Sequence, residues 1–528
     1  MGKLSSWKAV FFLCILFAAG AVSSPAQQVP VALAAFNGAN GGQPYNELVQ
    51  GSDGSFYGTT YQGGTGYTGS NFQGTVFKVT PGGGLTTLYN FCSIVGTVNG
   101  NTGVCIDGNA PLGPLAQAPD GNFYGTTSQG GTGHWPDGTV FRITPEGALT
   151  TIYNFCSMYD DTDGNCLDGH GPQGGLILGS DGNLYGTTSG GGPQWGGTVF
   201  RITTDGVLTT LAYFYINYDL YTDSPNSWLF QASDGNFYGA TSEGNDPLLC
   251  EYGCGAIFRI TPEGVPTIVH QFSETDGGYP SPVIEGPDGN LYGTTAIGGN
   301  GAYSSSSTYH CGTVFKMTKA GSLTTLYSFC NEPYCADGSF PNSGLALGPD
   351  GNFYGTTIYG GTGPDNACGD FSCGTIFRIT PSGSFTVLYS FYTEGGNSVG
   401  YAPGVGPIFG TDGNLYGTTQ SGLSTWGTVW RLDLGLSQFV ELEPSSGWVG
   451  EAVTILGDGL TGATAVSFNG TVAKFTVVSN SEIETAVPAG ATTGNVRVKT
   501  VRGTLTSNVP FQVLEPCVTG SCMAPLAR

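Results

Sequence analysis

Charged residues are scarce in this 528-residue sequence, and basic residues are the scarcest. Only 10% of the residues are charged, with 15 Lys and Arg against 38 Asp and Glu, which gives a formal net charge of −23. Seven of the 15 recur at one place in a repeat, and the rest of the repeat region has only Lys319. Such a surface cannot neutralise a polyanion, so the composition excludes nucleic acids and acidic polysaccharides as partners.

Helical periodicity is also missing after the first 25 residues, where glycine and aromatic residues dominate instead. The sequence holds 90 Gly, and 12% of its residues are aromatic. This mixture is typical of short strands joined by tight turns, so we predict an all-β protein. No apolar run of spanning length follows the first one, and we therefore expect no membrane span in the mature chain.

The first 26 residues have the three-part layout of a secretory signal. Lys3 and Lys8 precede the apolar run from Ala9 to Ala19, and small residues follow around Ala21 to Ala26. We predict that residues 1–26 are cleaved and that the protein is secreted or held at the cell surface.

Twelve of the 13 cysteines that remain after cleavage form neighbouring couples. Export makes disulfides the expected state, because the destination is oxidising. The couples are Cys92 with Cys105, Cys156 with Cys166, Cys250 with Cys254, Cys330 with Cys335, Cys368 with Cys373, and Cys517 with Cys522. Zinc is the alternative, but the spacings lack the usual paired Cys-x2-Cys. Cys311 is left over.

One pair of motifs recurs seven times. In the third copy Asp-Gly-Asn-Leu-Tyr-Gly-Thr-Thr covers residues 181–188, and Gly-Thr-Val-Phe-Arg-Ile-Thr covers residues 197–203. Each copy predicts a four-stranded antiparallel meander, because Asp-Gly between β-prone runs is a hairpin signal. The copies open at Asp53, Asp120, Asp181, Asp234, Asp288, Asp350 and Asp412.

The two ends of the repeat array predict a ring. The seventh copy stops after its third strand, at residues 427–434, whereas residues 31–36 have the character of a fourth strand without a sheet. The last sheet is complete only if the two ends meet. We therefore predict a seven-bladed β-propeller over residues 30–434, closed by residues 31–36.

The motifs Asp-Gly-Asn-Phe-Tyr-Gly-Thr-Thr, Gly-Thr-Val-Phe-Arg-Ile-Thr-Pro and Leu-Tyr-Ser-Phe resemble those of a bacterial extracellular tandem-repeat family called GloVer, or choice-of-anchor repeats. The resemblance implies an exported protein with a C-terminal anchor, and it implies no activity. Residues 437–515 resemble an IPT/TIG immunoglobulin-like domain, which implies a β-sandwich acting as a spacer or adhesion module. The tail, residues 516–528, shows no anchor pattern.

Loop lengths predict where a partner binds. The first turn and the third turn of each repeat stay short, whereas the other two connections vary, and alternating strand direction places the variable ones on one face. Aromatic residues in these loops suit stacking on sugar rings, so we predict a neutral glycan, or a surface protein, as the partner. The candidate residues are Trp135, Trp195, Trp426, Tyr303, Tyr309 and Tyr359. The alternative is loop drift, with disulfides merely tying down long loops.

One long loop suggests a calcium ion. Asp161, Asp163, Asn165 and Asp168 cluster around Gly164, although the spacing is not that of a complete calcium loop. The seven aspartates that open the repeats are predicted to form turns instead. The seven basic residues of the third strands are predicted to cover aromatic rings or to pair between repeats.

The leading hypothesis is an exported, non-enzymatic recognition or cell-surface protein. A carbohydrate-active hydrolase or lyase is the first alternative, using loop carboxylates such as Asp137, Asp161, Asp163 or Asp219. Hydrolysis needs two facing carboxyl groups, and the sequence pairs none, so no catalytic residue is assigned. A structural envelope or matrix component is the second alternative.

Overall fold

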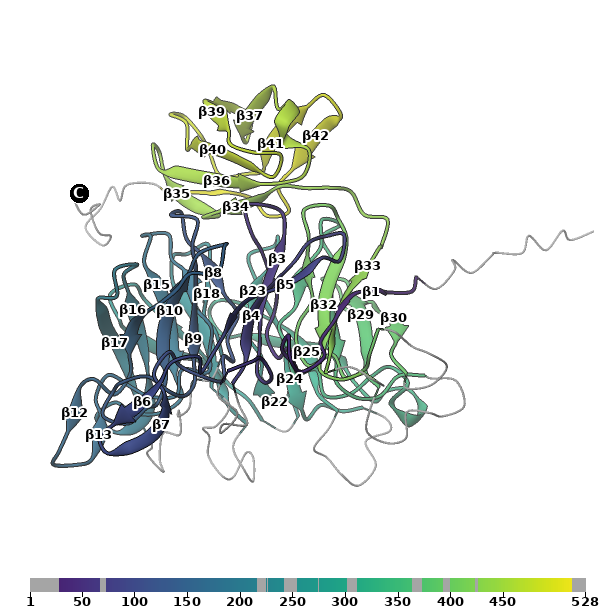
Figure 1. Ribbon diagram of the computed structural model, residues 1–528. Helices are drawn as coiled ribbons and strands as arrows, with labels where there is room; N and C mark the ends of the chain where they lie inside the picture. The colour runs from purple at the N-terminus through teal and green to yellow at the C-terminus, as the bar shows by residue number, and fades with distance from the viewer. Residues whose placement is uncertain are drawn as a thin grey trace, which may run out of the picture.

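The computed structural model describes residues 28–66, 73–215, 225, 227–241, 254–273, 275–301, 311–362, 373–392, 399–422 and 426–514. It is an all-β, propeller-like body of repeats with a small second body stacked on it (Figure 1). The predicted signal sequence and the C-terminal tail lie outside the described residues. No described helix is long and apolar enough to cross a membrane.

The described part of the repeat region forms seven sheets of antiparallel strands, one per repeat, and two additional two-stranded hairpins. The first three repeats contribute β2 (Val49–Gln50), β3 (Phe56–Thr60), β4 (Thr75–Val79) and β5 (Leu85–Asn90); β8 (Ala116–Gln117), β9 (Phe123–Thr127), β10 (Thr139–Ile143) and β11 (Leu149–Asn154); and β14 (Ile177–Leu178), β15 (Leu184–Thr188), β16 (Trp195–Ile202) and β17 (Leu208–Tyr215).

The fourth repeat contributes β18 (Phe230–Gln231), β19 (Phe237–Thr241), β20 (Ala256–Ile260) and β21 (Pro266–Gln271). The fifth has β22 (Gly278–Pro280), β23 (Ile284–Glu285), β24 (Leu291–Ile297), β25 (Thr313–Met317) and β26 (Leu323–Ser328). The sixth has β27 (Ala346–Leu347), β28 (Phe353–Thr357), β29 (Thr375–Ile379) and β30 (Phe385–Ser390), and the seventh has β31 (Ile408–Phe409), β32 (Leu415–Thr419) and β33 (Thr428–Leu432).

The aspartate that opens each repeat shapes its first turn. Asp181 accepts hydrogen bonds from the backbone N–H of Asn183 at 3.1 Å and from the hydroxyl of Tyr185 at 2.8 Å. Gly182 supplies the positive φ of +78° that the turn needs. The same two bonds recur in all seven copies, so these aspartates form turns, as predicted.

The basic residue of the third strand joins this turn. Lys78 Nζ lies 2.5 Å from Asp53 Oδ2 and 5.4 Å from the ring centroid of Tyr57, and Lys316 lies 2.6 Å from Asp288. These lysines therefore cover aromatic rings, as predicted, but they pair within their own repeat and not between repeats.

Buried aromatic contacts join each repeat to the next. Tyr57 stacks on Phe123 of the second repeat at a centroid distance of 4.0 Å, and the seventh repeat returns to the first through Tyr416 and Phe56, also at 4.0 Å. Seven buried apolar clusters bridge successive repeats, and one of them holds Tyr416 with Phe56. Every repeat sheet thus has a neighbouring sheet on both sides.

The N-terminal strand completes the seventh sheet. Strand β1 (Val31–Ala35) pairs antiparallel with β33, with Val31 opposite Arg431 and Ala35 opposite Thr428. The backbone N–H of Phe36 then donates to the carbonyl of Gly427 at 2.9 Å. The two ends of the repeat region therefore share one sheet.

The second body, which we call the C-terminal sandwich (residues 441–514), packs two sheets around a separate apolar core. One sheet contains β34 (Glu441–Glu443), β36 (Ala452–Leu456), β40 (Glu482–Ala486) and β39 (Phe475–Val477). The other contains β38 (Thr471–Ala473), β37 (Ala465–Phe468), β41 (Val496–Thr500) and β42 (Gly503–Thr506), while β35 (Ser446–Trp448) pairs in parallel with β43 (Gln512–Leu514).

The C-terminal sandwich sits on the face of the repeat body that carries the short turns, which we call the turn face (Figure 1). Ser481 Oγ donates to the carbonyl of Ser52 in the first turn, and the N–H of Phe439 donates to the carbonyl of Thr411 at 3.1 Å. The opposite face, the loop face, carries the hairpins β6 (Val95–Val98) with β7 (Asn101–Cys105) and β12 (Tyr159–Asp160) with β13 (Asn165–Cys166).

Replacing Phe36 with Ala tests the closure of the repeat body. Phe36 is fully buried and packs against Phe77 at 5.0 Å, so the Phe36→Ala variant should lose about 3–5 kcal/mol of unfolding free energy. Val31→Ala, at an exposed position of the same segment, should change it by less than about 0.5 kcal/mol. Urea unfolding measures both, and equal effects would contradict the packing of this segment.

Candidate functional site

Three indoles lie at the loop-face ends of third strands: Trp135 and Trp426 come shortly before β10 and β33, and Trp195 is the first residue of β16. Trp135, Trp195 and Trp426 expose 47%, 46% and 50% of their surface. The ring of Trp426 lies against the backbone of Gly38 and Gly42, where a Cβ on Gly42 would come within 2.9 Å of it. An indole held in this way keeps one part packed and leaves another part open to a ligand.

Tyrosines of the first and sixth repeats lie near enough to interact electrostatically. Tyr359 contacts Phe340 at a centroid distance of 5.7 Å. Burial raises the pKa of Tyr45, and so do the nearby phenols of Tyr61 and Tyr359. The sequence analysis did not include Tyr45 and Tyr61 among the candidate site residues, because only the circular arrangement of the repeats brings the first and sixth repeats together. The predicted site residues Tyr303 and Tyr309 lie outside the described residues.

The predicted calcium ligands differ in burial and in hydrogen-bond partners. Asp161 and Asp163 are exposed, whereas Asp168 is fully buried and accepts hydrogen bonds from the hydroxyl of Tyr153 at 2.7 Å and the N–H of Ser157 at 3.0 Å. Asn165 donates its side-chain amide to the carbonyl of Gly192. The described residues hold no group of three or more His, Cys, Asp or Glu that could bind a metal ion. The calcium hypothesis stays a prediction.

Asp168 belongs to a recurring structural pattern. Asp107, Asp276 and Asp337 likewise accept a hydrogen bond from an aromatic side chain of the preceding fourth strand. The donors are the Tyr89 hydroxyl at 2.7 Å, His270 Nε2 at 2.9 Å and the Tyr327 hydroxyl at 2.8 Å. Each aspartate also accepts a hydrogen bond from a backbone N–H of its loop. Each of the four stands before a Gly in the connection to the next repeat. That Asp-Gly recurrence is a signal in the sequence, and it identifies Asp168 as a residue that orders its loop.

The structure forms three of the cysteine couples as disulfides: Cys92–Cys105, Cys156–Cys166 and Cys330–Cys335. Cys254 and Cys373 are also disulfide-bonded, and their expected partners, Cys250 and Cys368, lie outside the described residues. Cys517 and Cys522 lie outside them as well. Cys311 is a buried free thiol.

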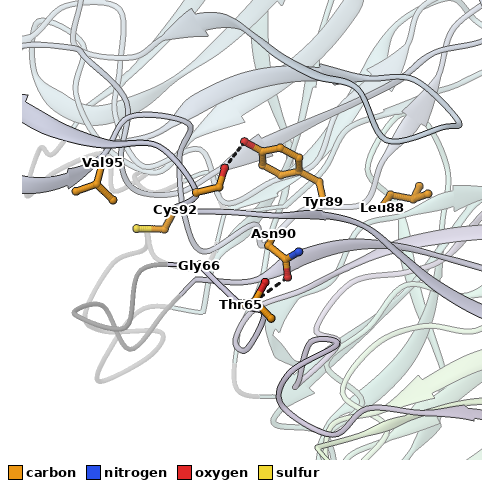
Figure 2. Close-up of a pocket in the computed structure, with 8 residues that line it drawn as sticks. Thr65, Gly66, Leu88, Tyr89, Asn90, Cys92 and Val95 are labelled. Carbon is orange, nitrogen blue, oxygen red and sulfur yellow. Dashed lines mark hydrogen bonds between the residues drawn. The ribbon is translucent and has the colours of Figure 1, made fainter.

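A surface pocket of about 530 Å³ lies beside the first disulfide (Figure 2). Its polar wall is already occupied by internal bonds, because Tyr89 donates to Asp107 at 2.7 Å and shares a 2.8 Å bond with Ser93. Asn90 Oδ1 accepts from the N–H of Thr65 at 3.0 Å. Few polar groups are therefore left for a ligand in this pocket.

An acid and an imidazole, Asp137 and His170, lie near enough to interact electrostatically between the second and third repeats. The side chain of Asp137 is partly buried, which raises its pKa, while the charge of nearby His170 acts in the opposite direction. Backbone bonds hold the two loops together, since the N–H of Gly171 donates to the carbonyl of Asp137 at 2.8 Å. Trp135 and Trp195 belong to the loops on either side. Asp219, another predicted candidate, lies outside the described residues.

A larger cavity, of about 630 Å³, lies where the first strands of all seven repeats come together, beneath the C-terminal sandwich. One apolar residue from each repeat, at equivalent positions, lines it: Val49, Ala116, Ile177, Phe230, Ile284, Ala346 and Ile408. We call this set the apolar ring. The C-terminal sandwich closes one end with residues of β34 and the segment that follows it.

Four glutamates line this central cavity. Glu285 pairs with Lys319 at 2.7 Å, whereas the carboxyl groups of Glu47, Glu441 and Glu443 have no hydrogen-bond or ion-pair partner in the described structure. Burial raises the pKa of Glu47 to about 8 and that of Glu441 to about 7. Burial also raises the pKa of Glu443 to about 8, with a further contribution from the charges of Glu441 and Glu482.

The sequence analysis missed these carboxyl groups. The position of Glu47 is occupied in the other repeats by Pro114, Gly175, Trp228, Pro282, Gly344 and Gly406. An aligned set of repeats would have shown one charged side chain at an inward position. The contribution of Glu441 and Glu443 depends on where the C-terminal sandwich docks, which no sequence pattern indicates.

The Gloeobacter/Verrucomicrobia repeat family matches residues 22–166, 158–368 and 251–473, and the IPT/TIG domain matches residues 437–513. The chain belongs to the Gloeobacter/Verrucomicrobia repeat family. Both predicted resemblances are therefore confirmed. No curated protein matches this repeat-family chain.

Solved structures that resemble this repeat-family protein are distant. One is a protein assigned as a gluconolactonase, with 16% identity and a TM-score of 0.31, over 56% of this chain and 80% of that chain. An oxidoreductase (glucose dehydrogenase) from Thermus thermophilus has 18% identity and a TM-score of 0.37, over 61% and 96%. The PQQ-bound aldose sugar dehydrogenase of Streptomyces coelicolor has 14% identity and a TM-score of 0.36, over 61% and 93%. These proteins assign no activity to the repeat-family chain.

The buried carboxyl groups predict how the stability of the protein depends on pH. Because the pKa of Glu443 is raised from about 4.3 in an unfolded chain to about 8, the folded protein should lose stability as pH rises between these values. Glu47 and Glu441 act in the same direction, whereas Glu285 is balanced by Lys319. Glu443→Gln should therefore raise the melting temperature at pH 8.5 and flatten its decline from pH 5 to 9.

Glu484→Gln is the matched control, because Glu484 lies on strand β40 of the same sheet but is exposed. Its melting profile should follow that of the unmodified protein. Identical pH profiles for the Glu443 and Glu484 variants would show that Glu443 is not buried against the repeat body.

Proposed function

We propose that the protein is an exported, non-enzymatic recognition protein that binds a neutral glycan on its loop face. The observation that carries the proposal is the set of three half-exposed indoles, Trp135, Trp195 and Trp426, at the loop-face ends of the third strands. A sugar ring presents an apolar face of C–H groups, and an exposed indole stacks on it without needing charge.

The frame for this site is a closed, seven-bladed β-propeller over residues 30–434. The ring contact of Tyr416 with Phe56 and the pairing of β1 with β33 support it, since both join the end of the repeat region to its beginning. In such a ring all the variable loops emerge on one side, so the indoles of the second, third and seventh repeats lie on the same face of the propeller.

The remaining parts fit an exported protein. Residues 1–26 are the proposed signal sequence, and the disulfide bonds suit an oxidising destination. Residues 437–515 form the proposed spacer domain, which covers the turn face and leaves the loop face open. Residues 516–528 follow as a tail. An envelope or matrix role stays a prediction.

A second candidate function is a carbohydrate-active enzyme. The observation that favours it is the partly buried carboxyl group of Asp137 beside His170, between the loops of Trp135 and Trp195. A carboxyl group with a raised pKa next to an imidazole is the kind of arrangement that performs general acid–base chemistry. The second carboxyl group that hydrolysis would need has no counterpart among the described neighbours.

Replacing the indoles tests glycan binding. On an array of neutral glycans or in a polysaccharide pull-down, Trp135→Ala, Trp195→Ala and Trp426→Ala should each weaken binding by about tenfold, because each removes one stacking surface. Trp448→Ala, in the C-terminal sandwich, is the control and should bind normally. Unchanged binding by the triple variant would remove the basis of the proposal.

Replacing Asp137 separates the two candidate functions. If the protein only binds glycans, Asp137→Asn should leave a bound polysaccharide intact and release no reducing ends, as the unmodified protein does. If the protein hydrolyses or cleaves its ligand, product release should fall by at least about a hundredfold in this variant. Measured product that depends on Asp137 would replace the recognition role with an enzymatic one.

A further inference from the structure

The central cavity has a layered interior. The first strand of each repeat runs from the loop face to the turn face, so residues two apart along it line successive levels. Glu47 lies at the level nearer the loop face, Val49 and the rest of the apolar ring form the next level, and Glu441 and Glu443 close the turn-face end. Carboxyl groups therefore stand at both ends of an apolar wall.

These carboxyl groups lack positive partners. The described residues that line the cavity include no Lys, Arg or His, and Lys319, which lies beside the wall, pairs with Glu285. Strand β34 alternates, so that Leu442 enters the core of the C-terminal sandwich while Glu441 and Glu443 face the cavity. An unpaired buried carboxylate is costly, and the cost falls when a positive charge is brought beside it.

Aromatic rings accompany the carboxyl groups. Phe230 and Phe409 belong to the cavity wall. At the loop-face end, a Cβ built on Gly344 would lie 3.0 Å from Glu47 Oε1 and 3.4 Å from Trp228 Cζ2, so the carboxyl group and the indole reach the same point from different repeats. Carboxylates together with aromatic faces are the groups that recognise organic cations.

We propose that the central cavity binds a small ammonium compound with an apolar body. Its charged group is held by the carboxylates of Glu441 and Glu443 or by that of Glu47, and its carbon skeleton packs against the apolar ring. The volume of about 630 Å³ is in the range of sites for small organic molecules. This site is separate from the indoles of the loop face and does not depend on the proposed glycan binding.

Calorimetry with a simple probe tests the site. Titrating the purified protein with hexyltrimethylammonium at pH 7.5 should give one site per chain, whereas hexanoate should not bind. Hexan-1-ol, which has a similar apolar body without the charge, should bind at least about tenfold more weakly. Binding should release protons, seen as heats that differ between buffers, because the cation favours the ionised carboxylates.

Two variants and one control locate the probe. Either Glu47→Gln or Glu443→Gln, whichever removes a carboxylate that holds the ammonium group, should weaken hexyltrimethylammonium binding by about tenfold. Both variants should preserve the fold, since glutamine has nearly the same shape as glutamate. Glu484→Gln, exposed and outside the cavity, should bind as tightly as the unmodified protein. Equal binding of hexan-1-ol, unchanged affinity in both cavity variants, or no binding of the cation would each overturn the proposal.

Discussion

The contact between the last repeat and the first is the constraint on which the rest of the structure depends. Each repeat has a tyrosine and a neighbouring apolar side chain that are buried only by packing against another repeat. Tyr416 of the seventh repeat packs against Phe56 of the first. A strand borrowed from the N-terminus completes the seventh sheet. Without that contact, the loops would not share one face, and the seven first strands would not enclose a cavity.

The scarcity of charge follows from the way each repeat is built. The buried hydroxyl of Tyr185 needs a partner, and the turn aspartate Asp181 supplies it while also bonding the turn backbone. The repeat's basic residue stands over the same pair, as Lys78 does over Asp53 and Tyr57. Nearly all the positive charge of the repeat body is thus used internally, which leaves a loop face suited to uncharged ligands.

Features that depend on local residues could be predicted from the sequence, whereas features that depend on the ring could not. The meanders follow from their Asp-Gly turns, and the shared last sheet follows from the offset of residues 31–36 against 427–434. The hydrogen bond of Asp168 to Tyr153 could not be read from the loop alone, because Tyr153 lies on a strand fifteen residues earlier. Glu47 was overlooked because its neighbours come from other repeats, and the docking of the C-terminal sandwich has no signature in composition or spacing.

The central cavity raises a question that stability alone does not answer. Glu47, Glu441 and Glu443 are partly buried and have no hydrogen-bond or ion-pair partner in the described structure, and a glutamine at each place would fill the same space without a charge. The repeats and the C-terminal sandwich each have an apolar core that does not involve these carboxyl groups. Their raised pKa values mean that the ionised carboxylates are less stable in the folded protein than in water, and a positive group placed beside them would favour the ionised form.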